Sequence, residues 1–239
     1  MARTKALLIL FLISLSGVLI LSEFIWPEHL YFWISLFVIG TAAPFFIRFE
    51  VRHISGREVV LISILAAIAG LSRVPFSAFP SVQPVTFVII VSSVVFGPES
   101  GFIIGTLSAF VSNLFLGQGP WTIWQMYAWG LIGVLAGFLG QTRILRSRLV
   151  LCVFGFLAGF LFGWIMNLWI ILMNHEWTWA MVMSYYLSSF YFDFAHALSN
   201  VFFLAIFSKS WIKILSRFKL KYRLLDDTQM THPKHKDTN

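Results

Sequence analysis

Charged residues are scarce in this 239-residue chain. Asp, Glu, Lys and Arg together make up 11% of it, whereas a soluble domain carries about 25%. Hydrophobic residues make up 59%, and the mean hydropathy is +0.84. This composition excludes an ordinary soluble domain and predicts a chain solvated by lipid. Cysteine is scarce too: Cys152 is the only one, which excludes a disulfide framework.

Motifs that carry chemistry are also missing. The chain has no G-x-x-x-x-G-K-[ST] phosphate loop, so it cannot hydrolyse ATP by that route. Neither the zinc-binding H-E-x-x-H motif nor the G-x-S-x-G motif of serine hydrolases occurs. We therefore expect a chain that is not an enzyme, with no catalytic residue, no metal site and no cofactor.

Long apolar runs are what the chain does contain. Most are close to the roughly 20 residues that a helix needs to cross a bilayer, and none alternates as barrel strands do. They predict an all-α polytopic membrane protein with eight helices. The runs are 6–22, 30–47, 58–72, 83–97, 100–116, 121–140, 149–172 and 186–208.

Two stretches need a separate interpretation. The first run resembles a signal peptide, but residues 21–24 make a poor cleavage site, so we expect an uncleaved span. A removed signal peptide is the alternative. The stretch 174–185 is too broken for a span and predicts a re-entrant or interfacial loop.

Lys and Arg predict the orientation. With the N-terminus in the cytoplasm, sixteen of the seventeen basic residues fall on the cytoplasmic side, a strong positive-inside pattern. We expect both termini in the cytoplasm of a bacterial cell. The net charge of +7 then reflects topology and anionic lipid, with no nucleic-acid partner. Only Arg73 falls outside.

The C-terminal segment carries its own basic pattern. Lys209, Lys213, Arg217 and Lys221 recur every four residues, opposite several apolar side chains. This pattern predicts a basic amphipathic helix that lies on anionic lipid of the inner leaflet, followed by a polar tail over 226–239.

Small residues recur at helical spacing and predict close helix packing. Two such sets fall in neighbouring runs, and a third lies in the seventh run. They are Gly101, Gly105 and Ala109; Gly133 and Gly137; and Gly155, Gly159 and Gly163.

Amides, aromatic residues and proline turns gather at the predicted extracellular end. The segments involved are 72–86, 112–124, 169–179 and 184–194. Aromatic residues that anchor the chain at the interface are one interpretation, but such a belt is expected at both faces and needs no amides. We favour an outward-facing ligand pocket.

One helix face carries ionisable residues. Asp193, His196 and Asn200 recur at i, i+3 and i+7, with Ser199 off that face. Ionisable residues within a span are costly, so they suggest a function, although a mutually hydrogen-bonded packing cluster explains them equally well. For Arg73 the alternatives are pairing with Asp193 or Glu176, capping the end of its helix, or donating to a ligand or to the following loop.

Several of these stretches together resemble one known family. Residues 57–140, with "FGPESGF", "SNLFLGQGPWTIWQM" and "FDFAHALSN", are similar to the substrate-binding S-component of energy-coupling factor (ECF) vitamin transporters, and most to its cobalamin-type branch. The resemblance covers residues 57–208. It implies a six-helix substrate-binding core over 57–208, a two-helix extension over 1–56 and a cytoplasmic segment over 209–239.

The resemblance also implies a mechanism. S-components bind a vitamin near the extracellular end, dock onto a transmembrane coupling protein with two ATPase subunits, and carry their pocket inward. The family's alanine-rich contact with the coupling protein maps onto Ala66 and Gly70, with Ser63 and Ala67 as a parallel register. Cobalamin is the expected ligand.

The same resemblance makes the amide-rich stretch one wall of a pocket and the segment 72–86 its lid and hinge. Aromatic side chains supply flat apolar area, and amides supply hydrogen bonds without the cost of burying charge. The expected substrate-binding residues are Arg73, Phe76, Phe79, Gln83, Thr86, Asn113, Gln118, Trp121, Trp124, Gln125, Tyr191, Asp193 and His196. The alternatives are an S-component for another vitamin or a modified base, and a secondary carrier or intramembrane enzyme that uses Asp193 and His196.

Overall fold

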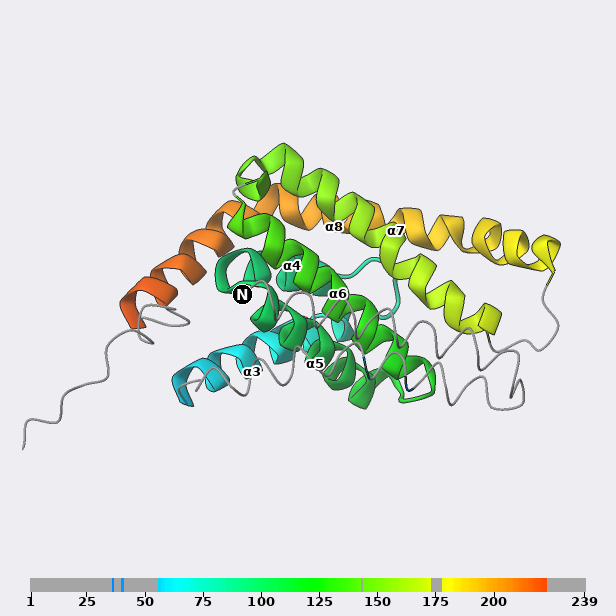
Figure 1. Ribbon diagram of the computed structural model, residues 1–239, viewed down its shortest axis with the longest axis horizontal. Helices are drawn as coiled ribbons and strands as arrows, with labels where there is room; N and C mark the ends of the chain where they lie inside the picture. The colour runs from blue at the N-terminus through cyan, green and yellow to red at the C-terminus, as the bar shows by residue number, and fades with distance from the viewer. Residues whose placement is uncertain (1–35, 37–39, 41–55, 143, 173–177, 223–239) are drawn as a thin grey trace, which may run out of the picture.

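The computed structural model describes residues 36, 40, 56–142, 144–172 and 178–222. In these residues the chain folds into a bundle of six α-helices without strands, which confirms the predicted fold class (Figure 1). The helices are α3 (Gly56–Leu71), α4 (Val85–Phe96), α5 (Pro98–Leu116), α6 (Trp121–Gln141), α7 (Arg148–Leu172) and α8 (Trp179–Tyr222). The two helices predicted over 6–22 and 30–47 lie outside the described residues, apart from isolated positions.

Helix α4 differs from its neighbours in length. Five of the described helices are long and apolar enough to cross a membrane, but α4 has 12 residues and measures about 18 Å at 1.5 Å per residue. All of its residues except Val94 are buried. A short helix that is apolar all round belongs in the middle of a bundle, where its neighbours rather than lipid surround it.

The turn between α4 and α5 is made by Gly97 and Pro98. Gly97 adopts a φ of 92°, which only glycine tolerates readily, and its amide donates to the Ser93 carbonyl at 2.8 Å. Pro98 then occupies the first turn of α5, where a missing amide costs nothing. In the motif "FGPESG", Gly97 alone therefore connects the end of α4 to the start of α5.

Helices α5 and α6 approach each other through glycines, as their spacing predicted. A Cβ on Gly105 would overlap the Trp129 carbonyl, and one on Gly133 would overlap the Gly101 carbonyl. The α7–α8 pair uses the same device, because Gly159 lies directly against the backbone of Ala197. Within a bilayer no hydrophobic effect drives helices together. Close backbone contact therefore stabilises the pair through van der Waals attraction.

The last helix is longer than the predicted span 186–208. Residues 179–185 form the start of α8 instead of a re-entrant loop, and residues 209–222 continue the same helix. The expected boundary at 208 therefore falls inside one helix of 44 residues. Figure 1 shows α8 running along the bundle and then turning away at its C-terminal end.

The C-terminal part of α8 also packs on the protein. Trp211 meets Phe87 of α4 edge to face, with ring centroids 5.5 Å apart. Lys219 Nζ donates to the Val95 carbonyl at 2.9 Å, one of the carbonyls that the end of α4 leaves without an intrahelical partner. Lys209, Lys213, Arg217 and Lys221 remain exposed, as the basic pattern predicted.

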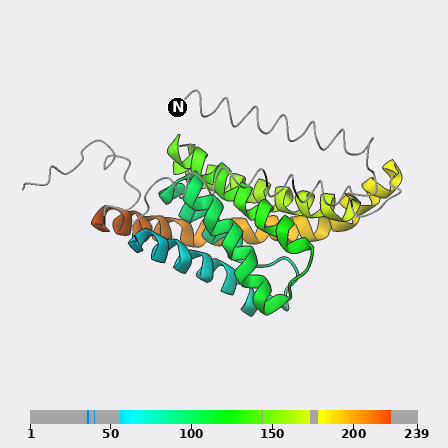
Figure 2. The same cartoon turned by 60° about the horizontal axis from the view of Figure 1, so that its bottom comes forward.

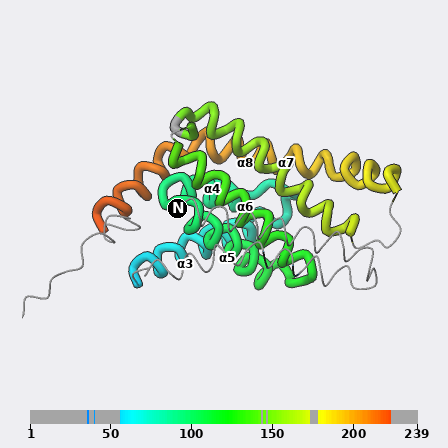
Figure 3. The backbone as a smooth tube through the Cα atoms, viewed as in Figure 1, coloured from blue at the N-terminus to red at the C-terminus, as the bar shows by residue number. Residues whose placement is uncertain are grey.

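The helices give the bundle two distinct ends. Turned by 60°, the molecule shows α3 and α7 on opposite sides (Figure 2). The tube in Figure 3 shows α8 beside α7 and α5 beside α3, with α4 and α6 between the two pairs. One end gathers the start of α3, the α6–α7 junction and the C-terminus of α8. The other end gathers the α3–α4 connection over 72–84 and the α5–α6 turn over 117–120. The polar residues singled out in the sequence lie mostly at this second end.

Candidate functional site

Arg73 lies at the centre of a polar network at this end. It follows the last residue of α3 closely and precedes a short 3-10 turn, Val74–Phe76. Its Nε donates to Gln83 Oε1 at 2.7 Å, and its Nη1 donates to Ser112 Oγ at 2.7 Å and Asn113 Oδ1 at 3.2 Å. The guanidinium carbon lies 5.0 Å from the ring centroid of Trp129. One cation therefore joins the 72–84 loop to α5 and α6.

These contacts bear on two of the alternatives for Arg73, pairing with Asp193 and donation to the loop. The side chain donates to the loop through Gln83, and it does not pair with Asp193, whose carboxylate accepts from Ser189 at 3.1 Å. Glu176 lies outside the described residues. The guanidinium is held by neutral oxygens and an aromatic face, an arrangement that keeps its charge uncompensated within the described part of the chain.

The amides form a second branch across the α5–α6 turn. Asn113 Nδ2 donates to Gln125 Oε1 at 2.7 Å and to Thr122 Oγ1 at 3.0 Å. Thr122 Oγ1 in turn donates to Gln118 Oε1 at 2.9 Å, and the Gly119 amide donates back to Thr122 Oγ1 at 3.2 Å. The positive φ of Gly117, 105°, lets the chain leave α5 and bring these groups together.

A third branch runs into the core between α4, α6 and α8. Trp129, which is fully buried, donates from Nε1 to Thr86 Oγ1 at 3.0 Å. Thr86 Oγ1 lies 2.9 Å from His196 Nε2. Because this hydroxyl already accepts from Trp129, its own proton is available to His196 Nε2, which favours the tautomer with the proton on Nδ1. Phe162 covers the pair, stacked on Trp129 at 4.6 Å.

Ser199 also belongs to the site, although the sequence placed it off the polar face of its helix. The backbone amide of Gln83 donates to Ser199 Oγ at 3.0 Å. The backbone carbonyl of Gln83 lies 3.2 Å from the same hydroxyl, which can donate to it. The loop residue is thus held by its side chain at Arg73 and by its backbone at α8. Thr122 was missed as well, although its place one turn before Gln125 could have revealed it.

The predicted aromatic residues divide between the core and the surface. Phe76 packs edge to face on Phe203, with centroids 5.8 Å apart, and Trp121 meets Trp169 at 6.1 Å. Trp124 is half-buried. Phe79 and Tyr191 are 62% and 71% exposed, and no contact joins Tyr191 to the Arg73 network in the described residues.

Asp193, His196 and Asn200 are all buried, as their shared face predicted, but they serve different contacts. Asp193 accepts from Ser189, and Asn200 Nδ2 donates to the Gly155 carbonyl at 3.0 Å. No hydrogen bond joins the three side chains to one another in the part of the chain that the structure describes. Asn200 hydrogen-bonds across the α7–α8 seam, Asp193 accepts within α8 and packs against Gly163 of α7, and only His196 reaches the network.

The small residues of α3 face two directions. Ala66 is 1% exposed, and a Cβ on Gly70 would lie 2.9 Å from the Ser108 carbonyl of α5. Ser63 is exposed and Ala67 half-buried, beside the exposed Val60, Ile64 and Ile68. The predicted contact through Ala66 and Gly70 is therefore turned inward in this structure, and the parallel register of Ser63 and Ala67 faces outward.

The site has the character of a binding site for a neutral or anionic molecule. Among the described residues no group of three His, Cys, Asp or Glu side chains could hold a metal ion. The network offers one guanidinium, four side-chain amides and four hydroxyls at the rim of an aromatic core. This combination of a few convergent polar groups with apolar walls is typical of small-molecule sites.

Comparison with known proteins matches the same region. A family model described as the substrate-specific component of the ECF transporter matches residues 57–220. A UPF0397 protein of Photobacterium profundum is 35% identical over 102 residues, which cover 41% of this chain and 54% of the relative. UPF0397 proteins of Vibrio atlanticus and Aliivibrio fischeri are 33% and 32% identical over 90 residues, covering 36% of this chain and 49% of each relative. The chain thus spans about half the length of the curated relatives it matches, and no solved structure matches it.

Proposed function

The chain belongs to the family of substrate-specific components of ECF transporters, and on this premise we propose that it binds a vitamin at the extracellular side of a bacterial cell membrane for uptake. The Arg73 network is the observation that supports a binding role for this end. It joins the loop over 72–84 to α4, α5, α6 and α8, so a ligand bound there would lie beside the loop and four helices.

The network also suggests how the ligand enters. In this structure Arg73 donates a hydrogen bond to Asn113, and Asn113 donates one to Gln125. A ligand that offers amide or other polar oxygens replaces these contacts one for one, at little cost in unpaired groups. Because Gln83 is the loop's anchor to both Arg73 and Ser199, exchange of those contacts for ligand contacts releases the loop.

A corrinoid of the cobalamin type is the ligand that we propose. It is a large molecule with amide side arms around a flat ring, and an amide-rich site with aromatic walls complements both features. A flavin or a modified base shares the flat ring and presents fewer amides. The resemblance of the three sequence motifs to the cobalamin-type branch supports the same choice.

We also propose that import uses partners. The chain carries no ATP-binding phosphate loop, so the energy comes from two ATPase subunits and a transmembrane coupling protein. The outward face of α3, with Ser63 and Ala67 among exposed aliphatic residues, is the proposed contact with the coupling protein. Both chain termini then lie in the cytoplasm.

A carrier or enzyme built on Asp193 and His196 gains no support from the geometry. The two side chains have separate partners, Ser189 and Thr86, and no described group links them. A proton relay or an acid–base pair needs its members within hydrogen-bond reach.

Direct binding and growth test the proposal together. The purified chain is titrated calorimetrically with cobalamin, riboflavin and a modified purine, and a vitamin auxotroph that expresses the chain with an ECF module is grown on each. We expect binding and growth with cobalamin alone. Growth on another vitamin would retain the S-component role and overturn the ligand. Growth without any ECF module would overturn the role itself.

A paired substitution localises the site. Gln125→Ala removes the acceptor of Asn113 and should weaken ligand binding about tenfold, the equivalent of one good hydrogen bond. Gln141→Ala removes an exposed glutamine from the other end of the same helix and should leave affinity unchanged. Equal affinity of the two variants would place the ligand elsewhere.

A further inference from the structure

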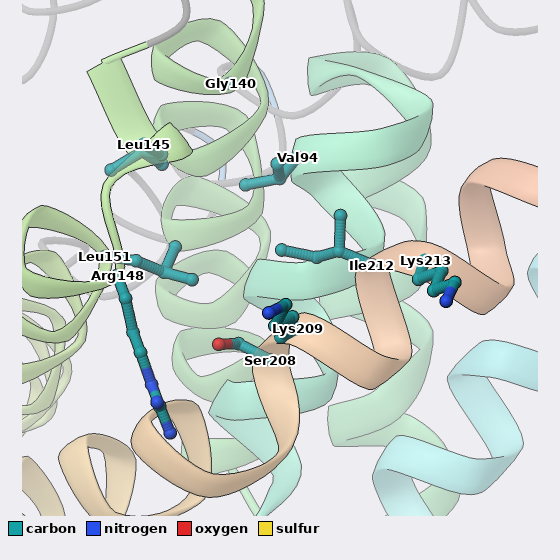
Figure 4. Close-up of a pocket in the computed structure, with 9 residues that line it drawn as sticks. All are labelled: Val94, Gly140, Leu145, Arg148, Leu151, Ser208, Lys209, Ile212 and Lys213. Atoms are coloured by element: carbon teal, nitrogen blue, oxygen red, sulfur yellow. The ribbon is translucent and has the colours of Figure 1, made fainter.

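A cavity of about 450 Å³ lies at the end of the bundle opposite the Arg73 network. Figure 4 shows it between the ends of several helices, lined by Val94 of α4, Gly140 of α6 and Leu151 of α7. Along α6, Gly140 is fifteen residues beyond Gln125, which corresponds to about 22 Å at 1.5 Å per residue. The cavity is therefore separate from the proposed vitamin site.

The walls of this cavity have two chemical characters. The side chains of Val94, Leu145, Leu151 and Ile212 line it with aliphatic surface. Arg148 at the start of α7, with Lys209 and Lys213 one turn apart on α8, adds three cationic groups, and Ser208 adds a hydroxyl. Figure 4 shows Ser208 and Lys209 close together beneath the aliphatic side chains.

The cations of this cavity have no counter-ion in the described part of the chain. No carboxylate there pairs with Arg148, Lys209 or Lys213, whereas Lys219 on the same helix is used to cap α4. Three like charges on one cavity repel each other and are stabilised by an anion that enters it. The cavity volume is within the range of about 300–1,000 Å³ that small-molecule sites occupy.

The surroundings of the cavity select the kind of anion. Within two residues of lining positions, Leu149 and Val153 of α7 and Phe207 and Ile214 of α8 expose aliphatic and aromatic surface. Both helices are long and apolar enough to cross the bilayer, so these exposed side chains are suited to contact with lipid. An occupant with a negative headgroup and an acyl chain satisfies both the cations and this apolar rim.

We propose that this cavity is a specific site for an anionic phospholipid. Its phosphate is bound by Lys209 beside Ser208, with Arg148 and Lys213 flanking the cavity on either side, and its acyl chain lies along α7 and α8. The site seals the junction of α4, α6, α7 and α8, which are the elements that line it. The proposal does not depend on the vitamin site or on its ligand, since the two lie at opposite ends.

The test uses the full chain purified in detergent. Binding of dioleoyl phosphatidylglycerol and dioleoyl phosphatidylcholine is counted by native mass spectrometry, and the melting temperature is measured with each lipid and with inorganic phosphate. We expect one tightly retained phosphatidylglycerol per chain, a rise in melting temperature with that lipid alone, and no effect of millimolar inorganic phosphate. Equal retention of phosphatidylcholine would overturn the role of the cations, and equal stabilisation by phosphate would identify the occupant as a soluble anion.

Two double variants on one helix separate the cavity from a diffuse basic surface. Lys209→Gln with Lys213→Gln removes two charges from the cavity and should weaken phosphatidylglycerol binding at least tenfold. Arg217→Gln with Lys221→Gln removes two exposed charges from the same stripe, outside the cavity, and should change binding less than twofold. Equal losses in both would overturn the site in favour of general attraction to the membrane surface. Arg148→Gln on α7 provides a second variant if the first does not fold, and it too should weaken binding.

Discussion

At the scale of single residues, Arg73 stabilises one end of the bundle through several contacts. Three hydrogen bonds connect it to the loop and to α5, and its guanidinium lies against Trp129. A charged donor with these partners rigidifies the site before any ligand arrives. Its loss leaves the half-buried Gln83 and the buried Ser112 and Asn113 without their charged donor.

Replacing Arg73 should therefore affect stability as well as binding. We expect Arg73→Gln to lower the free energy of unfolding by about 1.5–3 kcal/mol, the usual range for a hydrogen bond to a charged group. Reversible unfolding of the ligand-free protein in mixed micelles measures this directly. Arg73→Lys should recover only part of the loss, because an ammonium cannot serve the forked positions of a guanidinium.

Arg57 provides the control for Arg73. It lies exposed near the start of α3, the helix whose other end precedes Arg73, so Arg57→Gln should leave the unfolding free energy within about 0.5 kcal/mol of the wild type. If both arginine variants unfold alike, the network contributes nothing measurable and Arg73 is a solvated rim residue.

Sequence patterns predicted several residues of this network but not how they join. Arg73, Gln83, Asn113 and Gln125 could be expected at one end because polar side chains are rare in spans and must meet one another. Ser199 could not be found, since a helix face assigned from Asp193 and His196 excludes it. Its role depends on where the 72–84 loop crosses α8, and this crossing is set by tertiary packing.

At the scale of helices, glycine contacts define the α5–α6 pair. Gly105 of α5 contacts the Trp129 backbone of α6. The absence of a side chain at Gly105 therefore allows α6, which supplies a wall of the site, to pack this closely. We expect Gly105→Ala to destabilise the protein by about 1–3 kcal/mol, the usual cost of overpacking, because the obstacle is a backbone carbonyl that cannot turn aside. The melting temperature of the purified protein measures it.

Gly56→Ala is the matched change at a glycine without neighbours. Nothing described lies within 4 Å of the added methyl group, so the substitution should be neutral or slightly stabilising through the unfolded chain. Should Gly105→Ala melt at the same temperature as Gly56→Ala, the close approach of α5 and α6 would be contradicted.

The absence of helix-breaking residues predicts the length of α8 better than the polar and aromatic residues near its start. Residues 179–222 contain neither glycine nor proline, so nothing in them ends a helix. The interruption predicted over 174–185 rested on polar and aromatic residues, which change a helix's surroundings without breaking it. By contrast, the other five core helices followed from hydropathy because each run is bounded by glycine, proline or charge.

At the scale of the whole molecule, the two faces of α3 bear on the proposed contact with a coupling protein. Two registers of small residues, each four apart, are equally good in the sequence. Only the packing of α3 on α5 distinguishes them, because it buries Ala66 and Gly70 and leaves Ser63 and Ala67 outside. A bulky residue at Gly70 should therefore lower stability rather than block docking alone.

Ala67→Trp should separate docking from ligand binding. The indole would stand out from the proposed contact surface, so co-purification with an ECF coupling protein should fall at least tenfold. Vitamin binding by the isolated chain should persist, because the Arg73 network lies beyond the far end of the helix. Leu157→Trp, on the exposed face of α7, is the control and should leave both measurements unchanged. If the two variants co-purify equally well, the coupling protein contacts another face; if Ala67→Trp also loses the vitamin, the two functions are not divided between the ends of the bundle.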